Sequence, residues 1–116
     1  MAETLPKSER LHGQTTVAAL FEHGKSLQAG CLRCRYLRRE DDAPARIVVS
    51  VPKRSFKRAV KRNLLKRRIR ESYRRQKDLA APGLDILFVY TAREPLPYAD
   101  IYADVTAALN QISARG

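Results

Sequence analysis

The stretch RIVVSVPKRSFKRAVKRNLLKRRIRESYRRQK, residues 46–77, joins a short apolar run to a long basic one. Residues 46–51 are largely β-branched and almost continuously apolar, which is typical of a central strand covered on both faces. Pro52 ends this strand, because proline cannot donate to the hydrogen-bond ladder of a sheet. Residues 56–77 contain no Gly or Pro and are rich in Lys, Arg and Leu, so they predict one long helix.

The predicted basic helix has two faces of opposite character. One face is polar and positive, and it consists of Arg62, Asn63, Lys66, Arg67, Arg70 and Arg74. The side on which the helix would dock on a sheet consists of Leu65, Ile69, Ser72 and Tyr73. Like charges at i, i+4 destabilise an isolated helix by about 0.2–0.5 kcal/mol per pair. The positive face therefore indicates an external anion that offsets this repulsion.

The flanking sequence predicts two more helices and two more strands. Residues 15–23 and 99–113 have apolar side chains at helical spacing, and residues 31–39 and 84–91 have the pattern of strands separated by polar turns. The order is helix, strand, strand, helix, strand, helix, which predicts an α/β (α+β) two-layer sandwich with helices packed on a mixed sheet. A length of 116 residues predicts a single domain over residues 1–116.

The positive charge is concentrated in one segment. The chain has a formal net charge of +11, and residues 53–77 hold 13 of its 23 Lys and Arg residues but only one of its 12 acidic residues. A basic stripe on a near-neutral body predicts a polyanionic partner, because neutralising phosphates releases counterions. A basic surface kept only for solubility would spread the charge, and an ordinary solvated helix face would mix the signs.

Several other classes of protein are disfavoured. The N-terminal residues lack the apolar core of a secretory signal, and no run approaches the length of ~18 apolar residues needed to span a bilayer. A helix lying on a membrane would need bulky apolar residues free for the lipid, whereas here the core requires them. Two cysteines fit a reducing compartment. We therefore expect a soluble cytoplasmic protein that binds neither membrane nor DNA.

No residue pattern predicts catalysis or metal binding by the protein itself. Cys31 and Cys34 form a lone C-x-x-C, and on a strand the two side chains would point to opposite faces. Glu40, Asp41 and Asp42 lie in a turn with no nearby His or Lys that could complete a nuclease site. There is no glycine-rich phosphate loop and no nucleophile motif. We expect no catalytic residue, no metal site and no protein-bound cofactor.

Residues 51–74 resemble the signature of the protein component of bacterial ribonuclease P. The matching positions are, in order, Lys53-Arg54, Ala59-Val60, Arg62-Asn63, Lys66-Arg67, Arg70-Glu71 and Tyr73. Residues 5–11 and 21–25 also resemble the opening of that family. Three positions depart from the pattern: Leu64 replaces a second Arg, Ser55-Phe56 stands where a Gly is usual, and Arg68 replaces an apolar residue.

The resemblance implies a fold similar to that of a ribosomal protein, with a left-handed strand–helix–strand crossover. It also implies a protein that does not itself cleave RNA. In this family the RNA subunit, with bound magnesium, hydrolyses precursor tRNA and releases its 5′ leader, while the protein binds the catalytic RNA and the leader. The residues implied for contact with the catalytic RNA are Lys53, Arg54, Lys57, Arg58, Lys61, Arg62, Asn63, Lys66, Arg67, Arg70 and Arg74.

The leader is expected in a cleft between the first helix and the sheet. The candidate residues for this cleft are Val17, Phe21, Arg33, Arg35 and Tyr36. A mixed aromatic and basic lining suits single-stranded RNA, because bases stack on rings while arginines follow the backbone. Plain core packing is the alternative role for Phe21 and Tyr36.

Other functions are distinguishable by simple measurements. A ribosomal or ribosome-associated protein would co-purify with ribosomal RNA, and an autonomous nuclease would cleave precursor tRNA without any RNA subunit. Duplex DNA binding through one helix usually requires a dimer that matches two half-sites, and nothing in this sequence indicates one.

Overall fold

The computed structural model describes residues 14–115 of the chain, with side chains from residue 18 onward. The predicted family opening at residues 5–11 lies outside the described residues. The elements are α1 (Gln14–His23), β1 (Lys25–Ala29), β2 (Leu32–Arg38), β3 (Arg46–Ser50), α2 (Ala59–Arg74), the short 3-10 helix η2 (Lys77–Leu79), β4 (Leu84–Tyr90) and α3 (Tyr98–Arg115).

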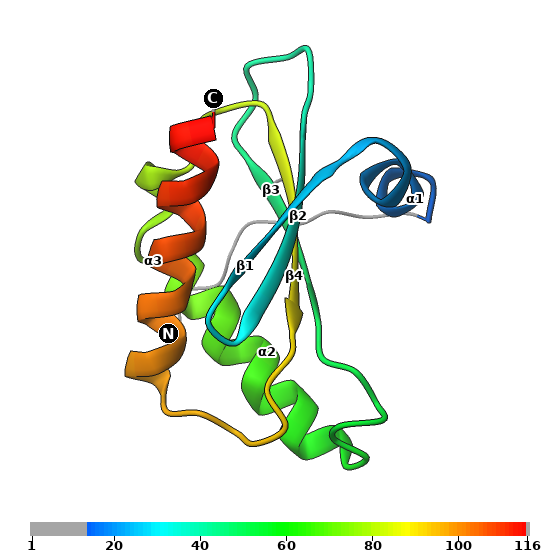
Figure 1. Cartoon of the computed structure of the whole chain (residues 1–116), viewed down its shortest axis with the longest axis vertical. Coiled ribbons are helices and arrows are strands. Elements are labelled where there is room, and N and C mark those ends of the chain that lie inside the picture. Colours follow the sequence, from blue (N-terminus) through cyan, green and yellow to red (C-terminus); the bar gives the residue numbers. More distant parts are fainter. Residues whose placement is uncertain (1–13, 116) are drawn as a thin grey trace.

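The four strands form one mixed sheet in the order β1-β2-β4-β3. β1 pairs with β2 and β2 with β4 in antiparallel fashion, whereas β3 and β4 are parallel. Parallel neighbours need a crossover connection, and α2 provides it between β3 and β4. Figure 1 shows α2 and α3 on one face of the sheet and α1 on the other. The mixed α+β architecture is confirmed, and the left hand of the crossover stays a prediction.

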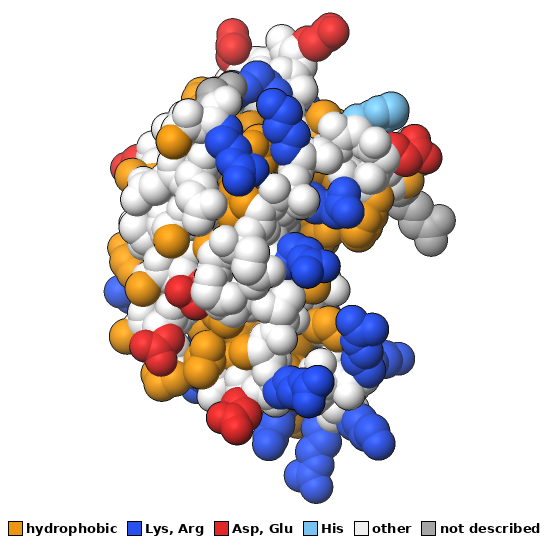
Figure 2. All heavy atoms as spheres, in the orientation of Figure 1, with side chains coloured by type: hydrophobic (Ala, Val, Ile, Leu, Met, Phe, Trp, Pro, Cys, Tyr) orange, Lys and Arg blue, Asp and Glu red, His pale blue; other side chains and the backbone are white. Residues whose placement is uncertain are grey.

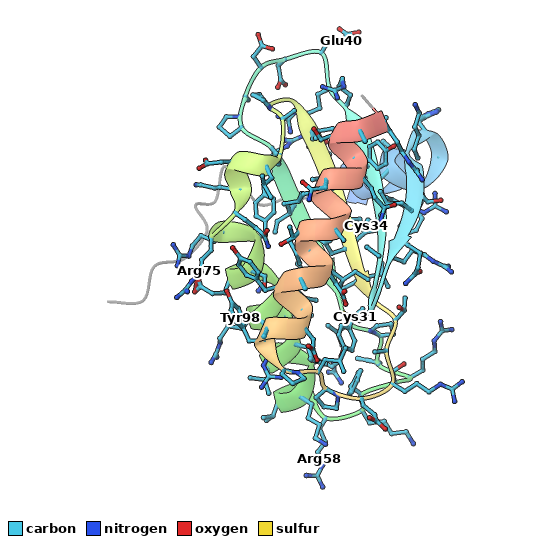
Figure 3. All side chains as sticks on the ribbon, turned by 60° about the vertical axis from the view of Figure 1, so that its left-hand side comes forward. Cys31, Cys34, Glu40, Arg58, Arg75 and Tyr98 are labelled. Atoms are coloured by element: carbon cyan, nitrogen blue, oxygen red, sulfur yellow. The ribbon has the colours of Figure 1, made fainter. Side chains whose placement is uncertain are left out.

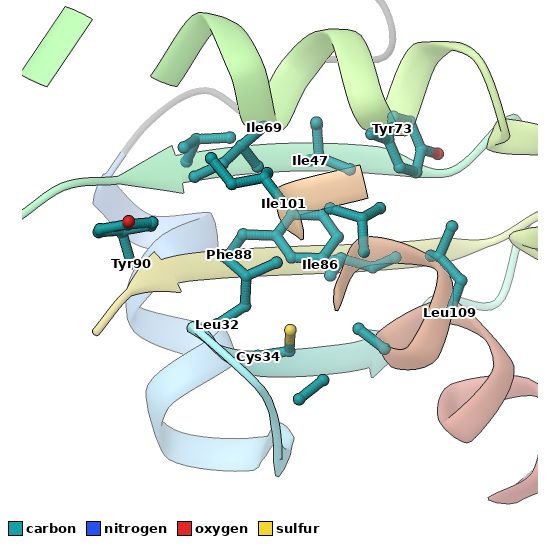
Figure 4. Packing of buried hydrophobic residues seen from close by; sticks show 14 of the residues in the cluster. Leu32, Cys34, Ile47, Ile69, Tyr73, Ile86, Phe88, Tyr90, Ile101 and Leu109 are labelled. Atoms are coloured by element: carbon teal, nitrogen blue, oxygen red, sulfur yellow. The ribbon is translucent and has the colours of Figure 1, made fainter. Parts of the chain in front are cut away.

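The main core lies between the sheet and the α2/α3 layer (Figure 4). α2 contributes the predicted docking residues Leu65, Ile69, Ser72 and Tyr73, all of which are buried. α3 contributes the apolar stripe Ile101, Val105, Leu109 and Ile112. The opposite face holds a much smaller buried cluster. As a result, α2 and α3 cover one face fully, and α1 leaves the other partly open.

The strand β1 was not predicted from the sequence. Only Leu27 and Ala29 of its five residues are buried, so this edge strand carries little apolar pattern. A tight turn at Gly30, whose φ of 56° is in the left-handed region that glycine tolerates, connects it to β2. Edge strands with polar outer residues avoid pairing with other chains, which is also why they are hard to recognise.

The helix α2 begins at Ala59, three residues later than predicted. The backbone amides of Ser55 and Phe56 both donate to the carbonyl oxygen of Pro52, which makes a turn there in place of the first helical turn. The Phe56 side chain is buried and its ring centroid lies 5.7 Å from that of Tyr90. Burial of this ring therefore holds the preceding residues out of the helix.

A buried carboxylate ties the β2–β3 connection to the sheet. Both oxygens of Asp85 accept hydrogen bonds of 2.9 Å from the Arg46 guanidinium, and Arg39 donates to the same carboxylate. Arg39 also donates to the carbonyl oxygens of Ala43 and Pro44, at 3.1 and 3.0 Å. Two arginines on one carboxylate satisfy a charge that could not be buried alone.

The two cysteines are buried free thiols, and Figure 3 shows them one after the other along the side of α3. The strand β2 begins at Leu32, so Cys31 lies in the preceding turn, and both cysteines belong to the main core cluster. The expected placement on opposite faces is thus wrong. Burial raises the pKa of Cys34 to about 12, and burial together with Asp104 raises the pKa of Cys31 to about 12. Both remain protonated near neutral pH and are poor nucleophiles and metal ligands.

Candidate nucleic-acid interface

Residues 52–58, here called the basic loop, present four cations to solvent. The buried ring of Phe56 anchors the loop from below, and the turn at Pro52 sets its direction. The predicted contact residues Lys53, Arg54, Lys57 and Arg58 are all exposed. Arg58 projects from the end of the molecule opposite Glu40 (Figure 3). A loop that is held by such contacts before it binds an anion loses less entropy on binding than an unattached one.

Arg62 holds the basic loop against α2. Its Nη1 donates to the carbonyl oxygens of Phe56 and Lys57, both at 2.8 Å. Arg62 was predicted to contact RNA directly, as part of the positive helix face. In the structure its Nη1 bonds within the chain, because the start of the helix faces the loop that precedes it, and contact of Arg62 with RNA stays a prediction. Its guanidinium contributes charge to the surface and also fixes the shape of the loop.

The outer face of α2 continues the positive surface beyond the loop. Lys61, Asn63, Arg67 and Arg70 are exposed, and Lys66 is half-buried. Near the end of the helix the charge is reduced, because Arg74 donates to the carboxylate of Glu71. The charged residues of α2 are therefore of one sign from Lys61 to Arg70, next to the basic loop, and of mixed sign only toward the end of the helix.

Two exposed apolar side chains interrupt this positive surface. Val60 is 79% exposed and Leu64 is 37% exposed. Leu64 is the position at which the sequence departs from the family's second arginine, and here it supplies an apolar contact in place of a charge. Such apolar side chains can pack against ribose or base edges, whereas the Lys and Arg side chains around them contact phosphates.

Arg93 joins the basic loop and was missed by sequence reasoning. A hollow of about 520 Å³ is lined by Arg54, Ser55, Thr91 and Arg93. Arg93 also lines a second hollow, of about 400 Å³, together with Lys57 and Arg58. The loop after β4 lies far from the basic segment in sequence and reaches it only through the parallel pairing of β3 and β4. The local indication in the sequence was an arginine three positions after the end of an apolar strand.

The partly open face of the sheet carries the predicted aromatic and basic residues. The guanidinium of Arg35 lies 5.0 Å from the ring centroid of Phe21, and its Nη1 donates to the Phe21 carbonyl oxygen at 3.2 Å. Phe21 is 53% exposed, and Arg33 on the same face of β2 is also exposed. Val17 lies on α1, but its side chain is outside the part that the structure describes.

Tyr36 does not belong to this face, which corrects the prediction. Side chains alternate along β2, and Tyr36 shares the α3-facing side with Leu32 and Cys34. It is 6% exposed and part of the main core cluster. The period of two along a strand already implied this orientation, since Arg35 must then point the opposite way.

The basic loop and the open sheet face lie on one side of the molecule. Figure 2 shows a hollow on that side, between α1 above and a group of Lys and Arg side chains below. Half-buried Val48 and Val89 pack on the floor of this face beside buried Leu20 and Leu87. A strand of nucleic acid could lie across an apolar and aromatic floor while its phosphates meet the basic rim.

Neither a metal centre nor a membrane span is found in the described part of the chain. No three His, Cys, Asp or Glu side chains among residues 18–115 are grouped so as to hold a metal ion. None of the described helices combines the length and apolar character that a bilayer crossing requires.

Comparisons with known proteins point to one family. Residues 5–113 match the model of the Ribonuclease P family. The Ribonuclease P protein component of Porphyromonas gingivalis is 42% identical over 77 residues, which cover 65% of this chain and 56% of that relative. The protein component from Nitrosomonas eutropha is 32% identical over 110 residues, covering 93% and 90%. The matched part of the chain thus spans little more than half the length of the first of these relatives.

Solved structures agree in fold. The RNase P protein from Thermotoga maritima superposes with a TM-score of 0.79 at 26% identity, covering 89% of this chain and 96% of that one. The RNase P protein of Staphylococcus aureus gives a TM-score of 0.81 at 20% identity, covering 91% and 96%, and supports the fold alone.

Proposed function

The chain belongs to the Ribonuclease P family, and on that basis we propose that it is the protein subunit of a ribonucleoprotein that removes the 5′ leader of precursor tRNA. One observation carries the proposal most directly. The basic loop and the first half of α2 form a positive surface of one sign, held in shape by Phe56 and Arg62. A preformed surface of this kind suits a folded RNA with phosphates at fixed positions.

The catalytic RNA would bind the basic loop and the outer face of α2. Arginines can grip a phosphate through two parallel hydrogen bonds, and lysines act as point charges. Each neutralised phosphate releases counterions, so the assembly should weaken steeply as salt rises. Val60 and Leu64 would contact ribose or bases at the points where the RNA backbone does not place a phosphate against the protein.

The single-stranded leader would lie across the open face of the sheet. The outer side of the Phe21 ring is available for a base to stack on, while Arg35 covers its inner side. Arg33 would follow the backbone of the strand. Contacts of this kind are insensitive to base identity, which suits leaders of varied sequence.

The hydrolysis itself is assigned to the RNA subunit with bound magnesium. The protein would lower the repulsion between two RNA molecules by supplying fixed positive charge between them. This charge would partly replace free magnesium in holding the substrate. The gain from the protein should therefore be largest where magnesium is scarce.

Reconstitution tests this function. We expect that the purified protein alone does not cleave precursor tRNA, and that adding it to its cognate RNA subunit at low magnesium restores release of the leader. Cleavage by the protein alone would instead identify an autonomous nuclease. Recovery of ribosomal RNA as the main co-purifying RNA would favour a ribosome-associated protein.

Phe21→Ala should weaken binding of precursor tRNA by about fivefold, because stacking of one base contributes roughly 1 kcal/mol at the lower end of its range. The low end applies because Arg35 already covers one side of the ring. Equilibrium binding to the reconstituted complex, with precursor and with mature tRNA, measures the effect.

The matched control for Phe21→Ala is Leu79→Ala, which removes an exposed apolar side chain of the η2 segment instead. It should leave both affinities unchanged. An equal loss for precursor and mature tRNA in Phe21→Ala would count against a leader site on this face.

A further inference from the structure

We propose that a pocket beneath the last turn of α3 binds the phosphate group of a nucleotide. The pocket has a volume of about 210 Å³, and its lining includes His23, Lys25, Tyr36, Arg38, Leu84 and Arg115. Its lining residues Arg115, Arg38 and Leu84 lie where α3 and β2 end and β4 begins. Figure 1 shows that end of α3 far from residues 52–58. The proposal therefore stands apart from the RNA surfaces described above.

The register of the sheet brings the lining residues together. Lys25 on β1 pairs with Tyr36 on β2, and Arg38 two residues later pairs with Leu84 on β4. Paired residues and residues two apart share one face, so all four point toward α3. Arg115 in the last turn of α3 closes the pocket from above, and its Nη1 donates to the Ser26 carbonyl oxygen at 3.0 Å.

The charge of the pocket is positive and unbalanced. It holds Lys25, Arg38 and Arg115 as well as His23, and none of its described lining residues is acidic. Among the described residues, the ion pair of a lining residue with an acid is that of His23 with Glu22, at 3.6 Å, and both of those side chains are exposed. Figure 2 shows Lys and Arg side chains gathered where α3 ends.

Cations near a helix C-terminus also offset the helix dipole, which amounts to roughly half a negative charge there. Three full positive charges exceed what that end of α3 can balance. A bound anion would offset the excess.

A second, independent observation is the hydroxyl of Tyr36. The side chain is 6% exposed, and its hydroxyl has no hydrogen-bond partner within the described part of the chain. Buried polar groups are nearly always paired, because leaving one unpaired costs free energy. A phosphate oxygen in this pocket would accept the phenolic hydrogen bond and remove that cost.

The volume of the pocket limits the size of the ligand. A volume of about 210 Å³ is below the roughly 300–1,000 Å³ typical of sites for drug-sized ligands, yet ample for a phosphate and part of its nucleoside. Leu84, on the same face of the sheet as Tyr36 and Arg38, supplies an apolar wall for the ribose or base. The phosphate could belong to a free nucleotide or to an RNA strand.

Amide chemical shifts of the full chain, titrated with inorganic phosphate and with uridine 5′-monophosphate, test the proposal. We expect saturable shifts at Leu37, Arg38 and Leu84. Arg115→Gln should weaken binding about tenfold and Tyr36→Phe about fivefold, since the first removes a charge-assisted hydrogen bond and the second a neutral one. Tyr36→Phe should keep the fold, because no described residue bonds its hydroxyl.

Tyr98→Phe is the matched control for Tyr36→Phe. Its hydroxyl is also buried without a partner among the described residues, but Tyr98 begins α3 at the opposite end from the pocket. It should leave phosphate binding unchanged. Absence of shifts at the pocket amides would overturn the proposal, as would equal weakening by Tyr36→Phe and Tyr98→Phe.

The variant Arg115→Gln, measured in the complex with the RNA subunit, distinguishes an RNA phosphate from a free nucleotide. If the pocket holds an RNA phosphate, this variant lowers affinity for the RNA subunit and reduces the salt slope by about one. If it holds a free nucleotide, RNA affinity is unchanged while nucleotide binding falls. Failure of RNA assembly as a whole would concern the proposed function and leave the titration of the free protein unaffected.

Discussion

Asp85→Ala is expected to lower the free energy of unfolding by about 3–5 kcal/mol, the cost of breaking a buried ion pair by removing one partner. The Asp85 side chain is 4% exposed and that of Arg39 is 12% exposed. Without the carboxylate, Arg39 would retain its charge in a place where water reaches it poorly, and Arg46, whose side chain is 34% exposed, would lose its bidentate partner. Because domains are stable by only about 5–15 kcal/mol in total, a large fraction of the stability would be lost.

Urea unfolding followed by circular dichroism measures this effect. Glu40→Gln is the control, since Glu40 is an exposed carboxylate in the same β2–β3 connection. It should change stability by less than about 0.5 kcal/mol. A loss below about 1 kcal/mol in Asp85→Ala would mean that the two arginines find other partners, and that the carboxylate does not hold the connection.

Replacing all four cations of the basic loop by glutamine should weaken binding of the RNA subunit by at least about a hundredfold and reduce the salt slope by about 3. The variant is Lys53→Gln, Arg54→Gln, Lys57→Gln and Arg58→Gln. The slope falls because each lost phosphate contact contributes about 0.7–0.9 to it. The fold should remain intact, since all four side chains are exposed and Phe56 still anchors the loop.

Filter binding or fluorescence anisotropy between roughly 50 and 500 mM salt would measure both the affinity for the RNA subunit and its salt slope. Arg75→Gln is the control, because Arg75 is exposed beyond the end of α2, over the ring of Tyr98. It should leave the slope unchanged. An unaltered slope in the fourfold variant would show that the RNA binds elsewhere.

Local patterns were sufficient for much of the fold. The period of the apolar residues in α2 identified Leu65, Ile69, Ser72 and Tyr73 as its docking side, and all are buried. The alternation along β2 separated Arg33 and Arg35 from Tyr36, although the aromatic character of Tyr36 suggested a place beside the RNA. The prediction for Tyr36 was wrong because it relied on the aromatic side chain and not on the alternation of side chains along the strand.

The strand β1 and the start of α2 could not be predicted from the pattern of neighbouring residues. β1 is an edge strand with two buried residues, so its pairing with β2 supplied the strand character that its own sequence lacks. The later start of α2 depended on burial of Phe56 against Tyr90, a residue 34 positions away. Neither contact is encoded in the spacing of neighbouring residues.

The sequence by itself determined the basic helix and its docking side and predicted a polyanionic partner, because charge and periodicity are local properties of a chain. Only the tertiary structure decided that Arg62 and Arg93 join the basic loop and that Asp85 meets two arginines. It also decided that Lys25, Arg38 and Arg115 line one pocket with Tyr36, whose hydroxyl has no partner among the described residues. These groups come from separate elements, and sheet pairing and helix packing bring them together.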